Sequence, residues 1–201
     1  MKVIFNYSGI YFEYLYRICN EEIRESKGFE EKILELQKKW DLEEDKILGK
    51  IDSLIGLKWK KEIIYAYLLP NLPNYNAHSI SDPLTIPMKF KKNHQILERN
   101  YSNLKATIVH EILHTLLYEG DWNKKEFYEY YKRKYPNLTK KTIIHIPIHA
   151  ILKELYLTLL GEEGLKLDLR LAENNKEYKI AWDIVENEGH KNIIERIKSL
   201  T

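Results

Sequence analysis

The spacing of apolar residues separates a first half with strand patterns from a second half whose patterns are helical. Short runs of β-branched and aromatic residues predict strands over residues 3–7 and 63–69. Residues 84–90 alternate between apolar and polar side chains like a third strand, but they include Pro87. Because proline has no backbone donor, we expect this third strand at the edge of a sheet.

Helical spacing of apolar residues accounts for most of the remaining chain. In the first half it predicts helices over residues 11–25 and 30–39, and a third helix, capped by Asp41, that carries Ile47 to Ile55. In the second half it predicts helices over residues 101–119, 123–135, 139–160, 165–174, 178–186 and 191–200. The fold expected is α+β: a small, antiparallel-type sheet with an edge strand near 84–90, packed on a mainly helical body, with an all-helical C-terminal half.

The length of the chain, 201 residues, suits one medium-sized domain. The sequence shows no internal repeat, no low-complexity tract and no clear linker. We therefore expect a single domain over residues 1–201, with a mixed strand and helix part over 1–98 and a helical part over 99–201.

The net charge and the cysteine content indicate which binding partners and which cellular compartment to expect. A net charge of +2 gives no indication of a nucleic acid or an anionic membrane as partner. Tyrosines and lysines are mixed in residues 127–135, which we interpret as a solvated basic edge of a helix. A lone cysteine, Cys19, forms no internal disulfide, which fits a reducing compartment. No apolar run approaches the roughly 18 residues that span a membrane, and the first residues turn polar too soon for a signal peptide, so we expect a cytoplasmic protein.

The chemistry of the chain is concentrated in the predicted helix 101–119, which contains the pattern H-E-x-x-H as His110, Glu111 and His114. Histidines four residues apart lie one turn apart on one helix face, close enough to hold one metal ion. Two neutral imidazoles suit Zn²⁺. Glu111 follows the first ligand and can reach a metal-bound water without binding the metal, which is the position of a general base. Apolar neighbours predict that this helix is buried, where an unpaired carboxylate is costly, and this favours a metal site over chance spacing.

This helix resembles the active-site helix of the zincin metallopeptidases, including the uncharged pair Ile112 and Leu113 between the two histidines. The resemblance covers this helix and, more loosely, the strand before it. It implies that His110 and His114 bind zinc, that Glu111 activates the attacking water, and that the substrate is a peptide or protein. Zincin-like enzymes receive an extended substrate at an edge strand, and the unpaired backbone of such an edge can bind a peptide by β-augmentation.

The branch within the zincins is left open by the sequence. The metzincin extension is absent, because its glycine and third histidine would fall at Leu117 and Gly120. The third-ligand pattern of the gluzincins, N-E-x-x-x-D, is only partly matched by residues 187–192, which lack the final aspartate.

A catalytic zinc takes three protein ligands and one water, so the third ligand has to come from another segment. His145 and His149 are again four residues apart, in the strongly apolar segment 143–151. If Pro147 is the first helical residue, His149 lies inside the first turn and is held firmly. We therefore favour His149 as third ligand, with His145 and a carboxylate such as Glu188 as the alternatives.

These residues predict a zinc-dependent hydrolase, most simply a peptidase, with Glu111 as general base and with His110, His114 and His149 as metal ligands. The alternative is a non-catalytic helical binding or regulatory protein with a closed structural zinc site. Such a site needs four protein ligands, which both His145 and His149 would complete.

Overall fold

The computed structural model describes residues 1–19, 28–73, 79–92 and 95–201. Contacts between residues divide the chain into two compact units. The first unit comprises Met1–Asp45 and Lys61–Thr115, and the second comprises Lys46–Lys60 and Leu116–Thr201. The expectation of a single domain over 1–201 stays a prediction.

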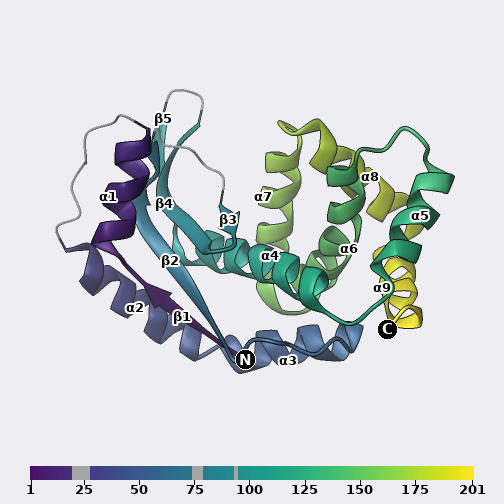
Figure 1. Ribbon diagram of the computed structural model, residues 1–201, viewed down its shortest axis with the longest axis horizontal. Helices are drawn as coiled ribbons and strands as arrows, with labels where there is room; N and C mark the ends of the chain where they lie inside the picture. The colour runs from purple at the N-terminus through teal and green to yellow at the C-terminus, as the bar shows by residue number, and fades with distance from the viewer. Residues whose placement is uncertain (20–27, 74–78, 93–94) are drawn as a thin grey trace. The chain divides into compact units, whose positions relative to one another are not determined.

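The first unit contains a five-stranded mixed sheet (Figure 1). Its strands are β1 (Lys2–Asn6), β2 (Ile63–Asn71), β3 (Ile80–Ser81), β4 (Leu84–Lys92) and β5 (Gln95–Glu98). The order is β1-β2-β4-β3, and β5 also pairs with β4. The expected α+β fold with a small sheet and a helical C-terminal half is confirmed. The sheet differs in one respect from an antiparallel one, because β1 and β2, and β2 and β4, run parallel. A long helical connection between β1 and β2 permits that direction.

The expectation that the strand near residues 84–90 is an edge strand is wrong. β4 pairs with β2 on one side and with β3 and β5 on the other. Among the described residues, however, no strand pairs with 86–88 on the outer side, between the β3 and β5 registers. Pro87 lies in this gap, and its carbonyl oxygen accepts a hydrogen bond from the Arg99 side chain. On this side of β4 no neighbouring strand in the described part of the chain requires a backbone N–H from residue 87, so a proline can occupy the position although β4 lies inside the sheet.

Helices cover both faces of this sheet. Helix α1 (Gly9–Ile18) buries Phe12 against Leu69 of β2. Helix α2 (Phe29–Asp41) places the ring of Trp40 6.0 Å from that of Phe5, which pairs with Ala66 of β2. Residues 66 and 69 of β2 point to opposite faces because side chains alternate along a strand. The predicted first helix extends into residues 20–27, which lie outside the described residues.

The second half of the chain is helical, as expected. Its elements are α5 (Lys124–Lys134), α6 (Lys140–Leu155), the π-helical turn η2 (Tyr156–Leu160), α7 (Glu162–Ala172), α8 (Lys176–Glu188) and α9 (His190–Ser199). Two further helices, α3 (Glu44–Ile55) and α4 (Tyr101–Glu119), have residues in both units. Helix α6 begins where the Thr139 hydroxyl accepts the amide of Thr142, so Pro147 is the eighth residue of the helix and not the first.

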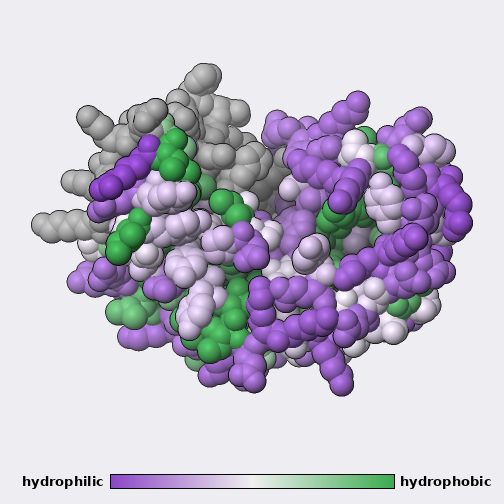
Figure 2. Space-filling view, in the orientation of Figure 1, coloured by the Kyte–Doolittle hydropathy of each residue, from purple (hydrophilic) through white to green (hydrophobic). Residues whose placement is uncertain are grey.

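Helix α6 is the core of the second unit. In the part of the chain that the structure describes, the segment Lys140–Leu160 is the one helix long and apolar enough to cross a membrane by length and composition. Its most apolar window is 61% buried inside the protein. Figure 2 shows mainly hydrophilic side chains on the visible face of the C-terminal helices. Burial beneath these helices accounts for the apolar composition of α6.

Candidate metal centre

The helix that carries H-E-x-x-H is fixed at its start and along its sides. Asn100 caps α4, because its side-chain oxygen accepts the amide of Asn103 at 2.9 Å. Ile108, Val109 and Ile112 are fully buried. A helix packed in this way holds its polar side chains in defined directions.

His110 and His114 lie together on this helix, as the spacing predicts. Their Nε2 atoms are 3.2 Å apart, and both side chains are half-buried. Two imidazole nitrogens bound at 2.0–2.1 Å to one tetrahedral zinc ion are about 3.3 Å apart. The observed separation therefore fits two ligands of one ion, and each histidine offers a ring nitrogen for that purpose.

Glu111 is buried beside the two histidines, with 9% of its surface exposed. The Ser81 hydroxyl, from the short strand β3, donates a hydrogen bond of 2.6 Å to its Oε2 atom. Burial raises the pKa of the Glu111 carboxyl, while the Ser81 hydrogen bond and the charge of Arg99 act in the opposite direction. This environment makes Glu111 a stronger proton acceptor than an exposed glutamate, which suits a general base.

Arg99 connects the sheet to the motif helix. Its Nε atom donates to the Pro87 carbonyl at 2.9 Å, and its Nη1 atom donates to the Thr107 hydroxyl at 3.1 Å. Burial lowers the pKa of Arg99 to about 10, and the charge of Glu111 opposes that shift. The guanidinium therefore stays charged at neutral pH. Nothing in the sequence indicated a role for Ser81 or Arg99, because no pattern distinguishes them from ordinary surface residues.

The second unit places His145 and His149 on one face of α6. His145 is 4% exposed, and its Nδ1 atom lies 2.8 Å from the Lys141 carbonyl oxygen. Because a carbonyl only accepts, Nδ1 carries the proton and Nε2 is left with the lone pair that a metal needs. Burial lowers the pKa of His145 and the hydrogen bond to Lys141 opposes this, so the ring is neutral at neutral pH. His145 is thus held in the tautomer whose Nε2 atom can bind a metal.

The ring of His149 is enclosed more completely. Only 1% of this residue is exposed, and its ring is stacked on that of Trp182, with centroids 4.5 Å apart and planes inclined by 12°. The ring of Tyr178 meets it edge-on at 5.7 Å. Aromatic rings therefore cover His149 on two sides.

The carboxylate alternative, Glu188, is engaged in a different network. Its carboxylate oxygens accept hydrogen bonds from the hydroxyls of Tyr131 and Tyr135 and form an ion pair of 2.9 Å with Lys134. This network ties α8 to α5. Of the remaining histidines, His190 bonds to Glu154, and His78 and His94 lie outside the described residues.

Comparisons with known proteins find no match for this chain, whether among models of protein families, curated proteins or solved structures.

Proposed function

We propose that the protein is a zinc-dependent hydrolase, most simply a peptidase, with Glu111 as general base. The observation that carries the proposal is the 3.2 Å separation of the Nε2 atoms of His110 and His114, with a buried carboxylate on the same helix. The residue types suit Zn²⁺. Two imidazole nitrogens that both bind the same zinc ion at about 2.0–2.1 Å are separated by about the observed distance. A peptide as substrate is supported by the resemblance of this helix to the zincin active-site helix.

For the third ligand we propose His145 in place of His149. The preference for His149 depended on Pro147 beginning a helix, but α6 begins seven residues earlier, at Lys140. His145 now has the stronger chemical support, because its Nδ1 proton is held by the Lys141 carbonyl. Metal-binding histidines usually donate their second ring nitrogen to such an acceptor, which fixes the tautomer.

The chain's own residues then divide the work of hydrolysis. A zinc ion held by His110, His114 and the third ligand would polarise the scissile carbonyl and would lower the pKa of the attacking water to roughly 7. Glu111 accepts the proton of that water and passes it to the nitrogen of the leaving amine. Ser81 binds one carboxylate oxygen and thereby sets the orientation of the other.

The experiment that tests this role compares peptide cleavage by the zinc-loaded wild type and the Glu111→Gln variant, using a mixed peptide library read by mass spectrometry. We expect the variant to lose about 100-fold or more in rate while keeping its zinc, because an amide cannot accept the proton. Glu119→Gln, on the same helix, is the matched control and should cleave like the wild type. Wild-type turnover by Glu111→Gln would remove Glu111 as the base.

A further inference from the structure

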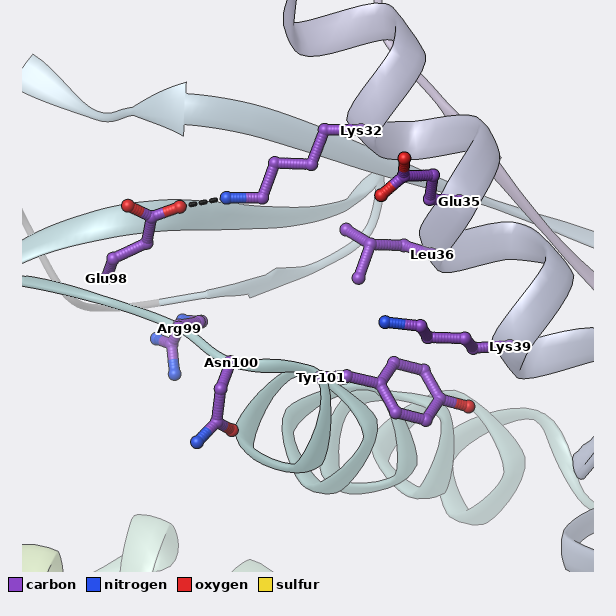
Figure 3. Close-up of a pocket in the computed structure, with 8 residues that line it drawn as sticks. All are labelled: Lys32, Glu35, Leu36, Lys39, Glu98, Arg99, Asn100 and Tyr101. Carbon is purple, nitrogen blue, oxygen red and sulfur yellow. Dashed lines mark hydrogen bonds and ion pairs between the residues drawn. The ribbon is translucent and has the colours of Figure 1, made fainter.

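A second candidate site lies in the first unit, between α2 and the start of α4 (Figure 3). It is a pocket of about 370 Å³. Its lining consists of Lys32, Glu35, Leu36 and Lys39 from α2, and of Glu98, Arg99, Asn100 and Tyr101. The four residues from α2 are spaced as neighbours on one face of a helix, so they form one wall. The volume falls within the range of pockets that hold small molecules.

Positive charge predominates in this pocket, where three cations face two carboxylates. Glu98 forms an ion pair with Lys32. Lys39 differs, because among the described residues no carboxylate lies within ion-pair distance of its ammonium group. That ammonium lies 5.9 Å from the centre of the Tyr101 ring, and Figure 3 shows it directed into the pocket. Lys39 is therefore a cation in a concave site for which the described part of the chain supplies no ion-pair partner.

Two features hold positive charge at this pocket in a fixed position. The Arg99 guanidinium is held by the Pro87 carbonyl and the Thr107 hydroxyl, so it contributes its charge without having to be ordered by a ligand. Asn100 caps α4, and the positive end of a 19-residue helix thus lies at the same pocket. Glu35 is the one lining carboxylate that opposes an anion without being paired with Lys32.

We infer that this pocket binds a small organic phosphate, with Lys39 as its main charged contact. Several cationic groups around one concavity suit a phosphate dianion with three oxygens better than they suit a ligand with a single carboxylate. Lysine is also a common binding residue for phosphate. The ring of Tyr101 and the side chain of Leu36 supply apolar surface for the organic part. This site contains none of the proposed metal ligands, and its test does not depend on the proposed hydrolase activity.

Binding is tested by ¹⁵N chemical-shift titration of the whole chain with phenyl phosphate and, separately, with inorganic phosphate, at constant ionic strength. We expect saturable shifts of the amides of Lys39, Asn100 and Tyr101, with a Kd on the order of millimolar for phenyl phosphate. Inorganic phosphate should bind several-fold more weakly, because it lacks the apolar part. Shifts that stay linear, or equal affinity for the two ions, would overturn the inference.

For each of four substitutions on α2 we expect a defined change in the affinity for phenyl phosphate. Lys39→Gln should weaken binding of phenyl phosphate about tenfold, since a charge-assisted contact is lost. Glu35→Gln should strengthen binding, and Lys39→Arg should preserve it. Lys38→Gln removes the same charge from an exposed neighbour that does not line the pocket, so its affinity should equal that of the wild type. Equal losses in Lys38→Gln and Lys39→Gln would show general charge attraction and would contradict the site.

Discussion

The hydroxyl of Ser81 donates a 2.6 Å hydrogen bond to the buried carboxylate of Glu111. The two residues are 30 positions apart, and the bond joins the two-residue strand β3 to the helix that carries H-E-x-x-H. A carboxylate that is both buried and hydrogen-bonded keeps one orientation. The protonation of Glu111 therefore depends on a residue that the motif does not contain.

Removing this hydrogen bond should change how stability depends on pH. Burial already raises the pKa of Glu111 above its ordinary value of 4.5, so the metal-free protein loses stability as pH rises from 4.5 through the folded-state pKa. Ser81→Ala removes a hydrogen bond that lowers the pKa of Glu111, so it raises that pKa further and widens the pH range over which stability is lost. We expect the variant's deficit in unfolding free energy, measured in urea, to be larger at pH 7 than at pH 4. A deficit that does not change with pH would contradict this environment of Glu111.

Glu44 should be a large contributor to the stability of the first unit. Its Oε1 atom accepts the amide of Val3 at 2.5 Å and the indole nitrogen of Trp40 at 2.8 Å, and the residue is 5% exposed. Glu44→Ala would leave two buried donors unsatisfied, at a cost of about 2–4 kcal/mol in unfolding free energy. Asp45→Ala, at the exposed neighbour, is the control and should cost less than about 0.5 kcal/mol. Chemical denaturation of both variants makes the comparison.

Gly164 should tolerate no side chain. A Cβ at this position would lie 2.6 Å from Cε1 of Tyr156, a residue that is 2% exposed and whose ring has little room to move. Gly164→Ala should therefore lower the unfolding free energy by about 1–3 kcal/mol. Gly49→Ala, in α3 with no atom within 4 Å of the added Cβ, should instead stabilise by about 0.5–1 kcal/mol. Thermal unfolding that shows equal effects at the two glycines would refute the argument.

The third ligand can be identified at His145 and His149. With His145 as third ligand and water in the fourth position, His145→Ala should weaken zinc binding by about 100-fold or more, because loss of even a residue that only orients a ligand costs about 10–100-fold in affinity. His149→Ala should then alter zinc affinity much less and act mainly through the packing around Trp182. A closed structural site predicts comparable losses in both variants. A larger loss at His149 would restore the ligand set expected from the sequence. Zinc dissociation constants at one pH decide among these outcomes.

The parts of this protein that sequence reasoning predicts well are local. The helix 101–119 and its two histidines follow from spacing within a few turns, and the structure reproduces the helix with the same ends. The direction of a strand and the identity of its neighbours depend on distant residues. For this reason Pro87 suggested an edge strand, whereas in the structure it lies in a gap between two outer strands.

The partners of Glu111 are also non-local. A two-residue strand such as β3 leaves no periodic pattern, so Ser81 had no signal in the sequence. Arg99 is distinguished only by its burial and by its contacts with Pro87 and Thr107. The position of Pro147 in its helix could not be predicted from the sequence either. The residues around a proline inside a buried helix look like those around a proline at the start of a helix.

The central claim is that His110 and His114 hold one zinc ion. The most direct measurement is the metal content per chain, by elemental analysis, after zinc loading and removal of free metal. We predict one zinc per chain for the wild type, one for Glu111→Gln, and close to none for His114→Ala. A wild-type content near zero, or an undiminished content in His114→Ala, would contradict the account.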